Sequence, residues 1–204
     1  MLSVLIVASS DEWHRYKQLE ECLLNEYHVQ FADKLGSSLK ELTELEASFD
    51  IFFYFKIPET SEISAISRLL KSKILIFHVR KDGYSPIQLK NELLPVASRV
   101  LLKATAMRGK LEYFRGVDEI LALNAFHIEP KEPCEVILNG IRDSKAMLGD
   151  IILRAGKNVI FAIRKNNIAI FSADIFSNEA FAEGQNCKFI HNLMTEMLVG
   201  VEFY

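Results

Sequence analysis

The chain has 204 residues, half of them hydrophobic, which is enough for one well-packed domain. Its formal charge of −3 and its scattered basic residues argue against nucleic-acid binding, which needs a basic stripe. No run approaches the roughly 18 apolar residues of a membrane span, and the short apolar run at the start has no basic residues before it. We therefore expect one cytoplasmic domain over residues 1–204, with no nucleic-acid or membrane partner.

The three cysteines, Cys22, Cys134 and Cys187, are far apart in the sequence and odd in number. A disulfide framework normally has an even number of closely spaced cysteines, so this pattern favours a reducing compartment. Metal sites built from cysteine need clustered spacing such as Cys-x-x-Cys, which the chain lacks. We therefore expect no disulfide framework, no metal and no cofactor.

Strand and helix signals alternate along the first hundred residues. Apolar runs with the composition of strands buried on both faces of a parallel sheet cover 2–9, 27–33, 49–55, 73–79 and 98–104. Segments with helical spacing of apolar residues lie between and beside them, at 13–25, 37–47, 60–71 and 87–94. This alternation predicts an α/β fold with a three-layer, doubly wound, mostly parallel sheet.

The second half of the chain has a mixed pattern. Short strands are predicted at 120–128 and 134–139, and two longer ones at 158–164 and 167–173. Only a few residues separate the last two, which predicts a β-hairpin with Asn166 or Asn167 in the left-handed region. A helix is predicted over 178–199, with Phe181, Phe189 and Met197 on one side.

The C-terminal block carries a family resemblance. The segments GKNVIFAIRKNNIAIFSADIFSN and GQNCKFIHNLM resemble the end of class I glutamine-amidotransferase-like domains. They are most similar to the non-catalytic branch that includes ThuA-like proteins and the domain shared by gliding-motility and intraflagellar-transport proteins. The matching positions are Ser172, Asp174, Phe176, Asn178, Asn186 and Phe189. The resemblance implies a flavodoxin-like, class I amidotransferase-like sheet with a C-terminal β-hairpin and helix, although the family hairpin usually has glycine where this chain has Asn167.

The motifs of the catalytic classes are missing from the sequence. A glutamine amidotransferase needs a cysteine on the turn after the fourth strand, where this chain has His78-Val-Arg-Lys-Asp-Gly. His127 and Glu129 have the spacing of an amidotransferase base and its orienting acid. They alternate with apolar residues, however, which predicts a solvated strand face. No Gly-x-Ser-x-Gly element, glycine-rich phosphate loop or acceptor aspartate at the end of the third strand is present.

Polar residues at the predicted carboxyl ends of parallel strands form the candidate ligand site, because open α/β sheets bind ligands there. These residues are Ser10, Lys56, His78, Arg80 and Asp174. Lys56 and Arg80 are cations that could hold an anionic or hydroxyl-rich ligand. Each residue also has a structural interpretation: Ser10 as a helix cap, the cations as solvated charges, His78 as a hydrogen-bonded core histidine and Asp174 as the organiser of a turn. No catalytic residue is assigned.

These observations favour a non-catalytic, amidotransferase-like domain that binds a partner protein or a small polar ligand. One alternative is a cysteine-independent enzyme acting on a carbohydrate or polyol, as the ThuA-like resemblance implies. A second alternative is a scaffold subunit or homo-oligomer that associates through the last helix and the aromatic tail at 199–204.

Overall fold

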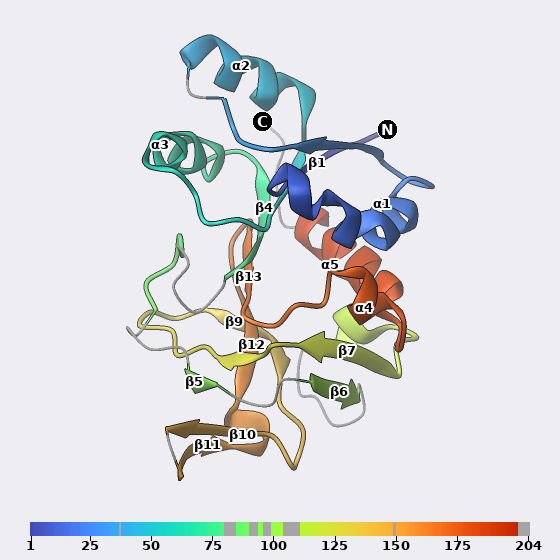
Figure 1. Ribbon diagram of the computed structural model, residues 1–204, viewed down its shortest axis with the longest axis vertical. Coiled ribbons are helices and arrows are strands. Elements are labelled where there is room, and N and C mark those ends of the chain that lie inside the picture. Colours follow the sequence, from blue (N-terminus) through green and yellow to red (C-terminus); the bar gives the residue numbers. More distant parts are fainter. Residues whose placement is uncertain are drawn as a thin grey trace.

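A computed structural model describes residues 1–36, 38–79, 85–89, 94–95, 99–103, 111–148 and 150–199 (Figure 1). Its main sheet has seven strands in the order β2-β1-β3-β4-β13-β12-β9. The first five run parallel to one another, and β12 is antiparallel to both of its neighbours. The predicted α/β, mostly parallel sheet is therefore confirmed. The strands are β1 (Ser3–Val7), β2 (His28–Ala32), β3 (Ile51–Tyr54), β4 (Ile74–His78), β9 (Glu135–Asn139), β12 (Ile160–Lys165) and β13 (Ile168–Phe171).

Helices cover both faces of this sheet. Alternate residues of its apolar strands point to opposite sides, so both faces carry apolar side chains that must be buried. Ile6 and Phe53 belong to a core shared with α1 (Lys17–Leu23) and α5 (Asn186–Val199). Their neighbours Leu5 and Phe52 belong to a second core, shared with α2 (Leu39–Ser48) and α3 (Thr60–Leu69). The predicted helix at 13–25 is realised as a 3₁₀ helix, η1 (Ser10–Tyr16), that leads into α1. No helix in the described ranges is both long and apolar enough to cross a membrane.

The β12–β13 hairpin forms as predicted, and Asn166 supplies the positive φ of 54°. Asn167 instead donates its side-chain amide to the carbonyls of Leu70 and Lys73, beyond the end of α3. The predicted helix over 178–199 is wrong in one respect, since it is split into α4 (Asn178–Phe181) and α5. Gly184 has a φ of 80° and a Cβ there would lie 3.1 Å from the backbone of β7 (Glu119–Leu123), so close pairing with that strand interrupts the helix.

The segment between β4 and β9 departs most from the prediction. The strand predicted at 98–104 is present as β6 (Arg99–Lys103), but it pairs antiparallel with β7, outside the main sheet. The described part of the helix predicted at 87–94 is not helical: Leu89 bridges Pro130, and β5 (Leu94–Pro95) pairs with β8 (Phe126–His127). Residues 90–93 lie outside the described residues. A residue that precedes proline is driven to extended backbone, which accounts for Leu94.

A β-hairpin that the sequence pattern did not predict follows β9. It consists of β10 (Lys145–Leu148) and β11 (Ile151–Ala155), and a 3₁₀ turn, η4 (Gly156–Asn158), connects it to β12. In Figure 1 the hairpin lies at the opposite end of the molecule from α2. Four of its large apolar side chains are exposed: Leu148, Ile151, Ile152 and Leu153.

The cysteines overturn one sequence expectation. Cys22 of α1 and Cys187 of α5 form a disulfide, and Cys134 is free. The two partners are 165 residues apart, so no local spacing could reveal that α1 and α5 share a face of the sheet. Because two of the three cysteines are paired, the cysteines no longer favour a reducing compartment.

Candidate functional site

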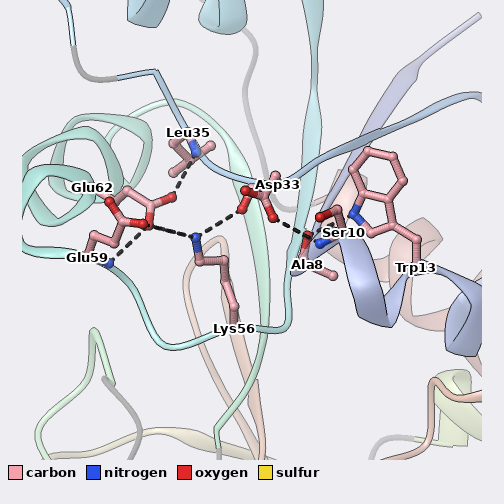
Figure 2. Close-up of polar contacts among 8 residues, drawn as sticks. All are labelled: Ala8, Ser10, Trp13, Asp33, Leu35, Lys56, Glu59 and Glu62. Carbon is pink, nitrogen blue, oxygen red and sulfur yellow. Dashed lines mark hydrogen bonds and ion pairs between the residues drawn. The ribbon is translucent and has the colours of Figure 1, made fainter.

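Lys56 is the centre of a polar network at the carboxyl edge of β1, β2 and β3. It lies two residues after the end of β3, and its Nζ donates to the Asp33 carbonyl oxygen at 2.9 Å and lies 3.2 Å from Glu62 Oε2. Figure 2 shows the Lys56 ammonium between Asp33 and Glu62, and Glu59 lies 4.0 Å away. The Lys56 side chain is only 11% exposed. The prediction that Lys56 is a solvated loop charge is therefore wrong. The lysine is largely buried, and its partners within the protein compensate for the lost hydration.

Glu62 is the buried anion of the same network. It lies in the first turn of α3, is 1% exposed, and accepts hydrogen bonds from the backbone N–H groups of Leu35 and Glu59 at 2.8 and 3.0 Å. These bonds hold the loop after β2 against the start of α3 (Figure 2). Burial raises the pKa of the neighbouring Tyr54 phenol, and the negative charge of Glu62 acts in the same direction. The network therefore contains a carboxylate and an ammonium that bond to each other and to backbone, beside a neutral phenol.

Ser10 joins this network through its backbone rather than its hydroxyl. Its N–H donates to Asp33 Oδ1 at 2.9 Å, at the point where η1 begins. Trp13 closes the same turn by donating its indole N–H to the Ala8 carbonyl at 2.8 Å. Asp33 thus links the ends of β1, β2 and β3 through its carboxylate and its carbonyl.

Asp174 organises the turn after β13. Its Oδ1 accepts hydrogen bonds from the N–H groups of Phe176 and Ser177, both at 3.0 Å, and Oδ2 lies 3.7 Å from Arg15. Its backbone bridges Leu123 of β7 through two hydrogen bonds of 2.9 Å, and the residue is 2% exposed. These contacts match the turn-building interpretation of Asp174 and leave its carboxylate committed to backbone and Arg15.

The other residues of the resemblance are structural in the same way. Ser172 donates its hydroxyl to the carbonyls of Phe126 and Phe161. The Asn178 amide bonds to the backbone of His14 and Gln18, and the buried Asn186 amide bonds to both backbone groups of Leu121 and to the Ile175 carbonyl. The pattern that carries the resemblance therefore specifies how β13, α4 and α5 are joined.

The five sequence candidates are only partly brought together. Ser10 and Lys56 share Asp33 as a partner, whereas Asp174 belongs to the turn beside η1. His78 ends β4 half-buried, with its ring 6.4 Å from that of Phe176. Arg80 lies outside the described residues.

Two acids of the network were missed from the sequence. Asp33 is the last residue of the second predicted strand, so the strand-end rule that selected Ser10 and Lys56 also applies to it. Glu62 stands in the first turn of a predicted helix, where an acid is ordinary, and only its burial distinguishes it.

The His127–Glu129 pair corrects another expectation. His127 is 2% exposed, not solvated, and its Nδ1 accepts the Ile160 N–H at 3.0 Å. Glu129 is bonded to Arg154 at 2.6 Å. β8 is covered on the side that the alternation assigned to solvent, because it packs against β12. The acid therefore pairs with Arg154 and the imidazole orders the start of β12.

No cysteine stands where an amidotransferase nucleophile belongs. Cys134 is the first cysteine after β4 in the sequence, and Cys22 and Cys187 are bonded to each other. Cys134 lines a surface depression of about 410 Å³ with Arg164 and Lys165, near the beginning of β13 and thus at the amino edge of the parallel strands. Burial, and then the charge of Glu132, raise the pKa of the Cys134 thiol, which opposes formation of a nucleophilic thiolate.

A larger surface groove, which we call the β9–β11 groove, lies between the last strand of the sheet and the unpredicted hairpin. Its volume is about 650 Å³, and residues of β9, β11, η4 and β12 line it, among them Val136, Leu153, Arg154, Lys157 and Ile160. The described lining residues include two cations and no carboxylate. Ile151 and Ile152 precede Leu153 on β11 and are also exposed.

Comparison with known proteins identifies a close relative and two distant structures. No family model matches the chain. An uncharacterized protein of Archaeoglobus fulgidus is 56% identical over 204 residues, which is the full length of both chains.

The structural neighbours share the fold at low sequence identity. A ThuA-like protein from Bacteroides uniformis has a TM-score of 0.61 at 11% identity, over 95% of this chain and 89% of that one. PurLQS from Thermotoga maritima has a TM-score of 0.54 at 10% identity, over 96% of this chain and 99% of that one. Both agree with the amidotransferase-like fold expected from the C-terminal block, and at such identity they show the fold alone.

Proposed function

We propose that this chain is a non-catalytic, amidotransferase-like protein-binding domain. It belongs to one family with the Archaeoglobus fulgidus protein, and the proposal extends to that family. In our proposal the β9–β11 groove binds an extended segment of another protein that carries apolar and acidic side chains. The carboxyl edge of the sheet, where this fold class binds ligands, then has a structural role.

The exposed apolar surface of β11 is the observation that carries the proposal. Ile151, Ile152 and Leu153 are 63%, 48% and 39% exposed and follow one another along one strand. Soluble proteins rarely leave contiguous apolar surface uncovered unless it binds something. Lys157 beside it, with no carboxylate among the described lining residues, favours an acidic side chain in the partner segment, whereas Arg154 is already paired with Glu129.

The strand-end side chains are already bonded within the protein, which supports a non-catalytic role. Lys56 is ion-paired with Glu62, and Asp174 holds its own turn. A ligand that used either side chain would have to break these contacts and leave a buried charge unpaired. The alternative is an enzyme that acts on a carbohydrate or polyol, and the fold shared with the ThuA-like neighbour is the observation that supports it.

Peptide selection on the intact chain tests the proposal. We expect random linear peptides displayed on phage, selected on the immobilised protein, to converge on alternating apolar residues flanked by Asp or Glu. The synthetic peptides should shift backbone amide signals of β9 and β11 in nuclear magnetic resonance spectra. Leu153→Glu, which puts a carboxylate into the groove, should weaken binding by about tenfold or more.

Leu148→Glu is the matched control, because Leu148 is a 53% exposed leucine of the same hairpin that does not line the groove. It should bind the peptides as the wild type does. Equal binding by Leu153→Glu would contradict the proposal. If the wild type is a dimer and Leu153→Glu dissociates it, the molecule bound in the groove is a second copy of this chain rather than another protein. Amide shifts near Ser10 and Lys56 with simple sugars or polyols would favour the enzyme alternative.

A further inference from the structure

The disulfide lies within a larger group of metal-binding side chains. Cys22 belongs to α1, Glu26 lies in the turn three residues beyond the end of that helix, and Cys187 and His191 are four residues apart on α5. Residues four apart on a helix lie on one face of it, as Cys187 and His191 do. Both sulfur atoms and one ring nitrogen of His191 lie within 4.8 Å of one another. Two helices on the same face of the sheet, with the turn after α1, thus bring two cysteine sulfurs, an imidazole and a carboxylate together.

The hydrogen bond of His191 orients its ring. Nε2 lies 3.0 Å from the Cys22 carbonyl oxygen, which can only accept, so Nε2 carries a hydrogen. Nδ1 is buried and has no hydrogen-bond partner within the described part of the chain, and Glu26 Oε2 lies 3.4 Å away. When Nδ1 carries no hydrogen, its lone pair faces the Glu26 carboxylate, and one metal cation can then bind both groups.

The donor set suits zinc. Thiolates and imidazole are the usual ligands of Zn²⁺, and a metal-bound histidine commonly donates its second ring N–H to a backbone carbonyl, as His191 does to Cys22. The Tyr27 ring is stacked with the imidazole at 6.1 Å and fixes its orientation. Two thiolates on one tetrahedral zinc are roughly 3.8 Å apart, given Zn–S bonds of about 2.3 Å. The disulfide and a bound zinc ion therefore exclude each other.

We propose that Cys22, Cys187 and His191, with Glu26 as the fourth ligand, bind one Zn²⁺ ion when the disulfide is reduced. A dithiol reductant gives two electrons and two protons to the disulfide and becomes a disulfide itself. The two protein thiols then release their protons to solvent as the metal binds. The pair of helices α1 and α5 is cross-linked by a disulfide in one state and by a metal ion in the other.

Cobalt titration of the intact protein tests this site. The disulfide is first reduced with a phosphine, which takes up the oxygen of a water molecule while the two sulfurs take up its hydrogens, and the excess is removed under nitrogen. We expect the reduced chain to bind one Co²⁺ with a thiolate-to-cobalt charge-transfer band, and the disulfide form to show no such band. Zn²⁺ should displace the cobalt and abolish the band.

Three variants separate this site from other thiol chemistry. Cys134→Ser removes the third cysteine, and it should titrate as the wild type does. Cys187→Ser should lose the charge-transfer band. His191→Gln keeps both thiols, so its folding can be verified in the disulfide form, and it should weaken cobalt binding by about tenfold or more.

Several results would overturn the proposal. They are a reduced wild-type chain that binds no cobalt, a band that survives in Cys187→Ser, and a band that disappears in Cys134→Ser. A His191 ring that carries hydrogen on both nitrogens at pH 8, seen in ¹⁵N spectra, together with unchanged cobalt binding by His191→Gln, would exclude the imidazole as a ligand.

Discussion

The carboxyl edge of the sheet and the β9–β11 groove use their side chains in opposite ways. At the edge, Lys56 and Glu62 are buried and bonded to each other and to backbone. At the groove, Leu153 and Lys157 are exposed to solvent. The first region has the position of a binding site in this fold class and the contacts of a structural one. The second has no such position, but its surface is available to a partner. Contacts, rather than position in the fold, distinguish the two.

Breaking the Lys56–Glu62 pair should have the largest effect. Lys56→Met leaves the Glu62 carboxylate buried without its cation, so we expect it to lower the free energy of unfolding by about 3 kcal/mol. Urea denaturation measures this loss. Lys56→Met combined with Glu62→Gln should recover most of it, because neither buried charge remains.

Lys40→Met is the matched control for Lys56→Met. Lys40 lies 3.9 Å from Glu44 with its side chain 87% exposed, so its loss should change the free energy of unfolding by less than about 0.5 kcal/mol. Equal stability of the two variants would mean that the Lys56 ammonium is not committed to Glu62. The carboxyl edge would then regain its standing as a ligand site.

Asp174 should show an intermediate effect. Asp174→Ala removes the acceptor of two buried N–H groups and should cost about 2 kcal/mol of unfolding free energy. Asp174→Asn keeps an acceptor oxygen and loses only the longer contact with Arg15, so it should cost about 1 kcal/mol or less. Thermal and urea unfolding of both variants measure the difference. Equal losses would assign the effect to the carboxylate charge rather than to the turn.

The sequence predicts the central sheet well because its strands carry their own evidence. The apolar runs that became β1, β3 and β4 are buried on both faces, and the Asn166 turn ties β12 to β13. The pattern fails where distant pairing decides the structure. Residues 99–103 have the composition of a buried strand, but composition does not say that β7 is their partner.

The site was less predictable than the sheet for the same reason. Strand-end position identified Ser10, Lys56 and Asp174 as polar residues of the carboxyl edge, but not the partners that occupy them. The alternating pattern predicts a solvated His127, because alternation does not reveal what covers a short strand. The pairing of Cys22 with Cys187 depends on two helices that meet only in the folded chain.

Tyr54 offers a smaller, pH-dependent test of the buried network. Its phenol pKa is raised from 10.0 by burial and by Glu62, so above pH 10 the unfolded chain loses this proton while the folded chain retains it. Its contribution to stability is therefore complete below pH 10 and declines as the pH rises further. Tyr54→Phe should change stability by less than about 1 kcal/mol at pH 7. From pH 10 to 11 the wild type should lose about 1 kcal/mol more than the variant. Parallel losses would mean that the phenol ionises as readily in the folded chain.

The smallest effect is expected on the exposed hairpin. Ile151→Thr removes little buried surface, since Ile151 is 63% exposed, and should change the free energy of unfolding by less than about 0.5 kcal/mol. Ile163→Thr makes the same chemical change at a fully buried position of β12 and should cost about 2 kcal/mol or more. Urea denaturation at two protein concentrations measures both. If Ile151→Thr is as costly as Ile163→Thr and its cost grows with concentration, the apolar surface of β11 is already covered by a second copy in solution. A small, concentration-independent effect leaves that surface available to a different partner.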